Sequence, residues 1–252
     1  MQIRLISGLW LVACLAVPAM IGCGSRDSGD RRSPEAAPPP VAERPTSLAN
    51  EPATAPKPSG PRIVVLGDSL TAGLGLASEE AYPAVLERRL RDEGFNYQVV
   101  NAGISGDTSA GGLSRIDLAL QGDVRVLIVA LGGNDGLRGL PVTQLKSNLS
   151  RIIERAQDRS ARVVLAGMEA PTNWGDVYTK AFRDVYPSLA QQYDLPLVPF
   201  LLEGVAAIPQ LNQRDGIHPT AEGDRIIADT VWKVLKPVLE RSPAPKKGAS
   251  GS

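Results

Sequence analysis

Residues 62–70 read RIVVLGDSL, and this stretch decides which fold the chain can adopt. Residues 63–66 form an apolar, β-branched-rich run without polar alternation, which is typical of a strand buried on both faces of a parallel sheet. Gly67, Asp68 and Ser69 then lead the chain out of the strand into a turn. Loops that follow the strands of an open parallel sheet meet at its carboxyl edge, where ligands bind. Ser69 is therefore expected at a ligand-binding edge.

Runs of the same kind recur along the chain and alternate with amphipathic segments. Strands are predicted at 63–66, 97–100, 124–131, 162–168 and 195–200. Helices are predicted at 82–93, 113–120, 142–158, 177–193 and 221–239. Such alternation predicts an α/β domain, at 62–241, with a central parallel sheet covered by helices on both faces.

Composition limits the classes of partner. The chain has 252 residues, 27 basic and 27 acidic side chains, and a formal net charge of zero. No large positive field is available to hold phosphate backbones, so nucleic acid is not an expected partner. The two cysteines lie within the first 23 residues, so residues 24–252 can form no disulfide. We expect a monomer.

The amino terminus has the pattern of an export signal. Arg4 precedes an apolar run that Pro18 interrupts, and the run is short for a bilayer span of about 20 residues. Residues 20–23, MIGC, resemble a bacterial lipobox, which predicts a lipoprotein signal peptide at 1–22 and lipidation of Cys23. A lipobox at Cys14, a simple cleaved signal and a retained membrane anchor are the alternatives.

The segments that flank the domain differ from it in composition. Eight of the 21 prolines fall between residues 25 and 60, among Ala, Ser, Glu and Arg. Such a composition cannot bury enough apolar surface to offset the entropy of ordering, which predicts a disordered tether at 23–61 and a disordered tail at 242–252. We therefore expect an exported, periplasmic protein that a lipid on Cys23 holds at the membrane. Because Gly24, and not Asp, follows Cys23, the outer membrane is the expected membrane.

Four short motifs follow predicted strands or precede the last predicted helix. They read GDSL at 67–70, NAGISG at 101–106, GGND at 132–135 and DGIHP at 215–219. A serine becomes a nucleophile when a base takes its proton and an acceptor fixes the tautomer of that base. His218 is the single histidine of the chain, and Asp215 precedes it by three residues. The motifs thus predict a catalytic triad of Ser69, His218 and Asp215.

Acyl transfer also needs donors that face the oxyanion. The backbone N–H groups of Ser69 and Gly103 and the side-chain amide of Asn134 are the candidates. Each motif alone is a common turn or helix cap, but four of them in order at one sheet edge are hard to obtain from turns. A dinucleotide-binding module, suggested by Gly73 and Gly75, lacks a third glycine at the required spacing.

These residues give the chain a resemblance to a known family. Ser69, Gly103, Asn134 and His218 match the four blocks of the SGNH, or GDSL, hydrolases, and Asp215 matches the partner aspartate. Residues 130–139, ALGGNDGLRG, and 178–182, YTKAF, are similar to the bacterial thioesterase, arylesterase and lysophospholipase branch. The resemblance covers about residues 62–239. It implies a three-layer α/β/α, flavodoxin-like fold and hydrolysis without a metal or cofactor.

The resemblance also implies a substrate class. We expect a serine esterase or thioesterase that acts on small-molecule substrates such as aryl esters, acyl thioesters or lysophospholipids. A polysaccharide or cell-wall O-acetyl esterase and a non-catalytic lipid-binding lipoprotein are the alternatives. A possible substrate loop comprises Leu137, Arg138, Gly139 and Leu140. Met168, Pro171 and Trp174 are candidates for lining an acyl pocket, Asp68, Asp107 and Thr108 for helix caps, and Asp135 for support behind Asn134.

Overall fold

The structure is a computed structural model that describes residues 60–241. The predicted signal peptide, Cys23, nearly all of the predicted tether and the predicted tail lie outside the described residues. Within this range the chain alternates strands and helices from residue 62 to residue 240.

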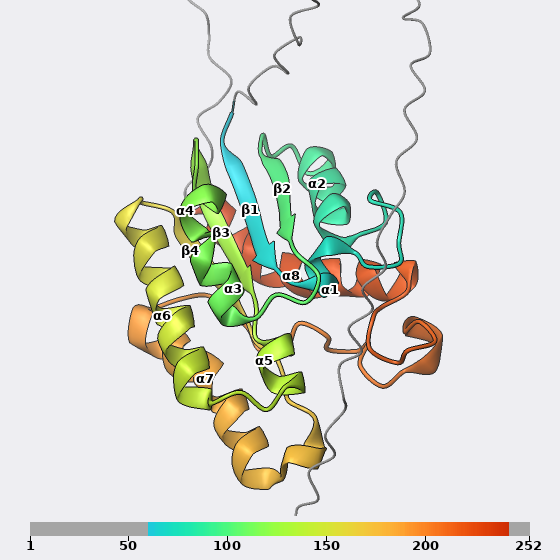
Figure 1. The fold of residues 1–252 in the computed structure, drawn as a ribbon. Helices are drawn as coiled ribbons and strands as arrows, with labels where there is room; N and C mark the ends of the chain where they lie inside the picture. Colours follow the sequence, from blue (N-terminus) through green and yellow to red (C-terminus); the bar gives the residue numbers. More distant parts are fainter. Residues whose placement is uncertain (1–59, 242–252) are drawn as a thin grey trace, which may run out of the picture. The chain divides into compact units, whose positions relative to one another are not determined.

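The centre of the domain is a parallel sheet (Figure 1). Its strands are β1 (Arg62–Gly67), β2 (Gln98–Gly103), β3 (Val124–Ala130), β4 (Arg162–Ala166) and β5 (Leu197–Val198). The order across the sheet is β2-β1-β3-β4-β5, which is the flavodoxin-like order. The strand order reverses at β1, because β2 and β3 lie on opposite sides of it. That reversal creates the crevice in which ligands of such sheets bind.

Helices cover both faces of the sheet, as Figure 1 shows. The long helices are α2 (Tyr82–Asp92), α6 (Val142–Asp158), α7 (Asp176–Tyr193) and α8 (Ala221–Glu240). The short ones are α1 (Ser69–Ala72), α3 (Ser109–Ser114), α4 (Ile116–Ala119), α5 (Gly133–Leu137), and the 3-10 turns η1 (Thr172–Trp174) and η2 (Pro209–Leu211). Helix α2 packs against α8, while α6 contacts α3, α4 and α7. The predicted three-layer α/β/α architecture is confirmed.

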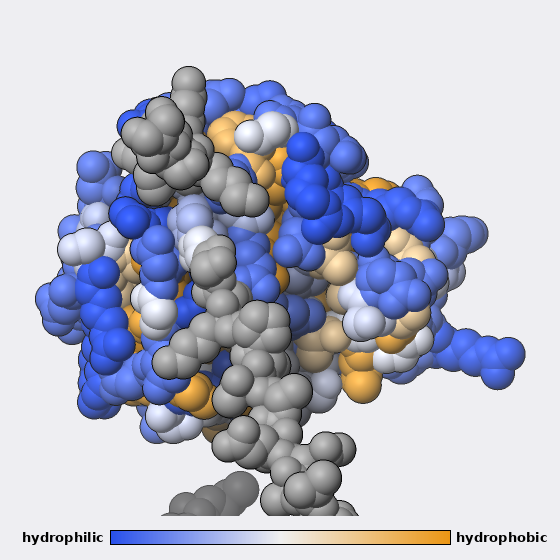
Figure 2. All heavy atoms as spheres, turned by 90° about the horizontal axis from the view of Figure 1, so that it is seen from above, coloured by the Kyte–Doolittle hydropathy of each residue, from blue (hydrophilic) through white to orange (hydrophobic). Residues whose placement is uncertain are grey.

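The register of the strands aligns the loops that carry the motifs. Gly67, the last residue of β1, pairs with Gly103 at the end of β2 and with Ala130 at the end of β3. The three loops therefore leave the sheet at one level, and α1 and α5 lie at the arrowheads of the strands in Figure 1. The face seen from above Figure 1, beyond the amino ends of the strands, is mainly hydrophilic with smaller apolar areas (Figure 2).

The strand predicted at 97–100 extends to Gly103 as β2, and the strand predicted at 162–168 ends at Ala166 as β4. Two predicted elements differ more strongly from the structure. The helix predicted at 113–120 starts earlier, because the Thr108 side chain caps α3, and it is interrupted at Arg115, which separates α3 from α4. Arg115 is held there by hydrogen bonds to the carbonyl oxygens of Gly67 and Ala102, which draw it toward the strand ends. The strand predicted at 195–200 is reduced to β5, with two residues.

The contact between α2 and α8 contains a buried acid. Asp224, in the first turn of α8, is 1% exposed, and its Oδ2 accepts the N–H of Tyr82 at 2.8 Å. Helix α2 has no side-chain cap of its own at Ala81, so the Asp224 carboxyl takes that place from another helix. Oδ1 is the one buried side-chain polar atom between residues 60 and 241 without a hydrogen-bond partner. Burial raises the pKa of Asp224 from 3.8 to about 7, although the bond from Tyr82 N–H acts in the opposite direction.

We expect Asp224→Asn to stabilise the protein at alkaline pH. Because the pKa is raised by folding, the folded chain binds more protons than the unfolded chain between about pH 4 and 7, and its stability falls as pH rises through that window. The full shift corresponds to at most about 4 kcal/mol, and the new amide leaves an N–H group unpaired, so we expect a gain of about 2 kcal/mol at pH 8. Urea unfolding at pH 4.5 and pH 8 measures it. An equal difference between variant and wild type at the two pH values would contradict this account.

Candidate active site

A cavity of about 630 Å³ opens at the carboxyl edge of the sheet. Segments that follow all five strands, and the loop before α8, contribute to its wall. Ser69, Asn134 and His218 lie in this wall. The remainder is largely apolar and includes Leu70, Leu74, Leu137, Met168, Ala170, Pro171, Phe200, Leu202, Ala206, Ala207 and Ile217.

Ser69, His218 and Asp215 form a continuous hydrogen-bond chain. The Oγ of Ser69 lies 2.9 Å from Nε2 of His218, and Nδ1 of His218 lies 2.7 Å from Oδ2 of Asp215. The serine and the histidine are 149 residues apart in the chain. The structure thus brings together the three side chains that the motifs predicted as a triad.

A local turn holds Asp215 against the imidazole. Its Oδ1 accepts the backbone N–H groups of Ile217 at 2.9 Å and of His218 at 3.0 Å, while Oδ2 faces the ring. The hydrogen bond from the His218 side chain, and then the two backbone N–H groups, lower the pKa of Asp215 to about 2. The carboxylate is therefore charged over the whole range in which an esterase would be assayed.

Ser69 begins the one-turn helix α1, and Asp68 caps this helix. The Leu70 N–H donates to Oδ1 of Asp68 at 3.0 Å, and the Asn134 amide lies 3.4 Å from its Oδ2. Burial raises the pKa of Asp68 to about 6, against the hydrogen bonds from Leu70 and Asn134 and the charge of His218. The interpretation of Asp68 as a helix-start residue agrees with this geometry.

Gly103, predicted as an oxyanion donor, does not line the cavity. Its N–H donates to Oδ1 of Asn101 at 2.9 Å, and a Cβ at this position would lie 2.3 Å from the backbone nitrogen of Ala72. Gly103 therefore allows β2 to approach α1 closely. Gly106, three residues later in the same motif, lines the cavity. Both glycines occur in the NAGISG motif, and the path of the chain after β2 decides that Gly106, and not Gly103, reaches the cavity.

Asn134 lies in α5 with its amide directed by the neighbouring loop. Its Nδ2 donates to the carbonyl oxygen of Asp107 at 3.0 Å. Behind it, Asp135 is buried and accepts both the N–H of Ser109 at 2.7 Å and its hydroxyl at 2.6 Å. These bonds fix α5 against α3, so the interpretation of Asp135 as support for Asn134 agrees with the structure.

The predicted substrate loop is only partly in the cavity. Leu137 lines it, whereas Arg138, Gly139 and Leu140 do not. Arg138 donates from Nη2 to the carbonyl oxygen of Gly106 at 2.9 Å, and the hydroxyl of Tyr178 donates to the carbonyl oxygen of Leu140 at 2.8 Å. The side chain of Trp174 packs against Gly139. The loop is thus attached both to α7 and to the loop that carries Gly106.

Met168 and Pro171 line the cavity as expected, but Trp174 does not. Asp107 is also not a helix cap, because its carboxylate binds Nε of Arg115 at 2.7 Å. Arg115 is a residue that motif reading did not select. Its bonds to Gly67, Ala102 and Asp107 join the ends of β1 and β2 beneath the site, and an arginine within a helical pattern gives no local signal for such a role.

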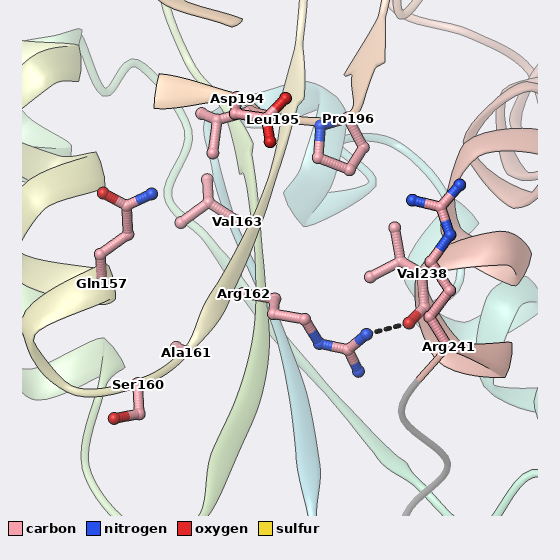
Figure 3. Close-up of a pocket in the computed structure, with 10 residues that line it drawn as sticks. All are labelled: Gln157, Ser160, Ala161, Arg162, Val163, Asp194, Leu195, Pro196, Val238 and Arg241. Carbon is pink, nitrogen blue, oxygen red and sulfur yellow. Dashed lines mark hydrogen bonds between the residues drawn. The ribbon is translucent and has the colours of Figure 1, made fainter. Parts of the chain in front are cut away.

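A second cavity, of about 500 Å³, lies at the amino ends of β4 and β5 (Figure 3). Apolar side chains of Val163, Leu195 and Val238 contribute to it, and Arg162 donates a hydrogen bond to the carbonyl oxygen of Val238 across it. None of the predicted site residues is among those that line it. The chemistry of the motifs therefore belongs to the carboxyl edge.

Two further observations apply to residues 60–241. Their side chains form no group of three or more His, Cys, Asp or Glu residues arranged to hold a metal ion. No helix in this part of the chain combines the length and the apolar character that a membrane span requires.

Comparison with known proteins identifies relatives of the chain. The model of the GDSL-like lipase/acylhydrolase family matches residues 65–226. Esterase TesA of Pseudomonas aeruginosa is 46% identical over 178 residues, which are 70% of this chain and 89% of that protein. Thioesterase 1/protease 1/lysophospholipase L1 of Escherichia coli K12 is 41% identical, over 70% of this chain and 84% of its own.

Solved structures agree with these matches. A crystal structure of TesA superposes with a TM-score of 0.68 and 45% identity, over 71% of this chain and 99% of that chain. AlinE4, an esterase of the SGNH-hydrolase family, gives a TM-score of 0.60 and 45% identity, over 75% of this chain and all of its own. The resemblance drawn from the four motifs is confirmed. The chain belongs to the GDSL-like lipase/acylhydrolase family and is an ester hydrolase.

Proposed function

We propose that the domain hydrolyses carboxylic esters and thioesters through an acyl-Ser69 intermediate. The observation that carries this proposal is the hydrogen-bond chain from Ser69 through His218 to Asp215 at the wall of an apolar cavity. A serine hydroxyl 2.9 Å from an imidazole nitrogen can pass its proton to that nitrogen as it attacks a carbonyl carbon.

The reaction then follows from the positions of these groups. His218 accepts the serine proton at Nε2, and the tetrahedral adduct collapses when the alcohol or thiol departs with that proton. Water attacks the acyl-serine in the same manner, which releases the acid and restores Ser69. Asp215 holds the proton of His218 on Nδ1, so that Nε2 is the acceptor in the resting state.

An oxyanion at the reacting carbonyl needs hydrogen-bond donors that face the cavity. We assign them to the backbone N–H groups of Ser69 and Gly106 and to the side-chain amide of Asn134. Gly106 replaces Gly103 in this role, because Gly106 lines the cavity while the N–H of Gly103 is bound to Asn101. Arg138 donates a hydrogen bond to the carbonyl oxygen of Gly106. This bond fixes the peptide group between residues 106 and 107, which adjoins the Gly106 N–H.

The wall of the cavity favours an acyl chain as the group that it binds. Its volume falls within the usual range for small-molecule sites, and most of the residues that line it are apolar. Relatives named as an esterase, a thioesterase/lysophospholipase and an arylesterase support aryl esters, acyl thioesters and lysophospholipids as substrates. Phe200 is the one aromatic residue among the described residues of this wall, which disfavours a polysaccharide O-acetyl esterase.

A hydrolysis profile of the purified protein tests this function. It compares p-nitrophenyl esters and acyl-coenzyme A thioesters of increasing chain length, a lysophospholipid, and an acetylated polysaccharide. We expect turnover of the esters and thioesters and little release of acetate from the polysaccharide. Preferential deacetylation of the polysaccharide would refute the proposed substrate class, although not the serine mechanism.

Asn134→Ala tests the oxyanion site. We expect kcat to fall about 10²- to 10³-fold with a small change in KM, because the amide would stabilise the transition state more than the bound substrate. Steady-state kinetics and the melting temperature are measured together. A variant that melts at a lower temperature but keeps its kcat would show that Asn134 is only a structural residue of α5.

We also infer that the protein is exported and lipid-anchored through Cys23. The apolar run at 5–21, the MIGC sequence and the Pro-rich segment that follows it support this placement. Gly24 supports the outer membrane as the destination. The multiple acyl chains of a bacterial lipoprotein would hold the protein stably, since each buried CH₂ contributes about 0.8 kcal/mol.

Cys23→Ala is expected to move the enzyme out of the membrane fraction or to block its processing, while kcat and KM of the recovered protein stay at their wild-type values. Cell fractionation, mass spectrometry of the amino terminus and kinetics measure the three effects. Recovery of soluble wild-type protein that begins beyond Cys23 and carries no lipid mass would exclude the anchor.

A further inference from the structure

Helix α1, which carries Ser69, cannot fix its own position. It has four residues, and an isolated helical turn is unstable because nucleation fixes several dihedral angles for a single hydrogen bond. The direction of the Ser69 hydroxyl therefore depends on the tertiary contacts of α1. His218 comes from a different segment, the loop before α8, so the distance between serine and histidine depends on how the two segments are connected.

Thr71 joins α1 to other elements by hydrogen bonds. Its side chain is fully buried, and its Oγ1 lies 2.7 Å from the hydroxyl of Tyr82. Its carbonyl oxygen accepts the side-chain amide of Asn101 at 2.8 Å. Gly67 provides the space for the threonine, since a Cβ at that position would lie 1.9 Å from Thr71 Oγ1.

Tyr82 is in turn fixed by the helix that follows His218. Its side chain is fully buried, and its backbone N–H donates to Oδ2 of Asp224 at 2.8 Å. Burial raises the pKa of Tyr82, so its hydroxyl stays protonated. Asp224 lies six residues after His218 in the chain. The contacts from Thr71 through Tyr82 to Asp224 thus join the segment of the nucleophile to the segment of the base.

We propose that Tyr82 is a positioning residue for the esterase reaction, which acts through the Thr71 hydroxyl to hold Ser69 within hydrogen-bond distance of His218. The inference rests on the proposed role of Ser69 as nucleophile. Tyr82 does not line the cavity, so its loss would not remove a substrate contact. The Ser69–His218 pair and the Thr71–Tyr82–Asp224 contacts close a ring, and a displacement of about 1 Å within such a ring costs up to about 100-fold in rate.

The test compares Thr71→Val, Tyr82→Phe and the double variant, which all preserve shape and remove hydroxyls. Thr71→Ser removes only the methyl group of Thr71 and keeps the hydroxyl. Tyr193→Phe is the matched control, because the Tyr193 hydroxyl binds Glu154 at 2.6 Å between α7 and α6, away from the site. For each variant, kcat and KM with a soluble short-chain ester, the rate at which an organophosphonate labels Ser69, and the melting temperature are measured.

We expect Thr71→Val and Tyr82→Phe each to lower kcat and the labelling rate about tenfold with KM unchanged. The double variant should be no slower than either single variant, because both remove the same interaction. It should also regain melting temperature, since neither buried hydroxyl is left without its partner. Thr71→Ser and Tyr193→Phe should retain the wild-type kcat.

Two results would overturn the proposal. One is a fall in melting temperature with kcat unchanged, which would mean that the half-buried Gln213, whose amide binds the carbonyl oxygen of Leu74, suffices to keep the two segments together. The other is a kcat that follows the melting temperature and recovers in the double variant. Ser69→Ala is assayed alongside: if it retained activity the proposed function itself would fail, whereas an inactive Ser69→Ala with unaffected Tyr82→Phe removes only the role of Tyr82.

Discussion

Ser69→Ala is expected to lower kcat about 10⁶-fold, and His218→Ala to do the same, because neither member of such a pair contributes without the other. Ser69 donates its hydroxyl to Nε2 of His218, and the chain contains no other histidine that could take over as base. Loss of Ser69 removes the nucleophile, and loss of His218 removes the base that activates it.

The fold should survive both substitutions. Ser69 and His218 are partly exposed at the cavity wall and belong to no part of the hydrophobic core. Melting temperature and active-site labelling by an organophosphonate accompany the kinetics. Ser114→Ala is a suitable control, since it removes a hydroxyl whose bond is local, to the carbonyl oxygen of Gly111. Wild-type rates in a folded Ser69→Ala protein would place the nucleophile elsewhere.

The sequence predicts most of the fold because the strands are short, continuous apolar runs. Residues 63–66 and 126–130 lie in the middle of the sheet, where both faces are buried, and no polar alternation blurs their limits. Helices of one turn lack this signal. Helices α1 and α5 are too short to show a period, so they were foreseen only as turns or helix starts.

The site was predictable to the extent that a motif fixes the direction of its residues. Asp215 and His218 lie in one tight turn, so their contact follows from local sequence. The NAGISG motif does not fix the direction of Gly103 and Gly106 in this way, because Gly103 ends β2 and Gly106 lies in the loop that follows it. Which of them reaches the cavity depends on Asn101, which binds the N–H of Gly103, and on the close packing of β2 against α1.

Long-range contacts outside the four motifs were not visible in the sequence. Thr71, Tyr82 and Asp224 come from three elements, and each has an ordinary local explanation as a helical or core residue. Arg115 was hidden in the same way within a predicted helix. Such residues are recognised only when the fold shows which backbone groups they reach.

Asp215→Asn is expected to lower kcat about 10⁴-fold while leaving the fold and KM almost unchanged. The substitution separates two roles of this side chain. Oδ1 builds the turn by accepting the N–H groups of Ile217 and His218, and the asparagine carbonyl can replace it there. The amide NH₂ would then face Nδ1 of His218 in place of the carboxylate oxygen, which favours the tautomer with the proton on Nε2. In that tautomer His218 cannot accept the serine proton.

Asp215→Ala, which loses the turn as well, should lower the melting temperature in addition to kcat. Equal melting temperatures for the two variants would show that the turn does not depend on Asp215, and an unchanged kcat in the asparagine variant would remove Asp215 from the mechanism.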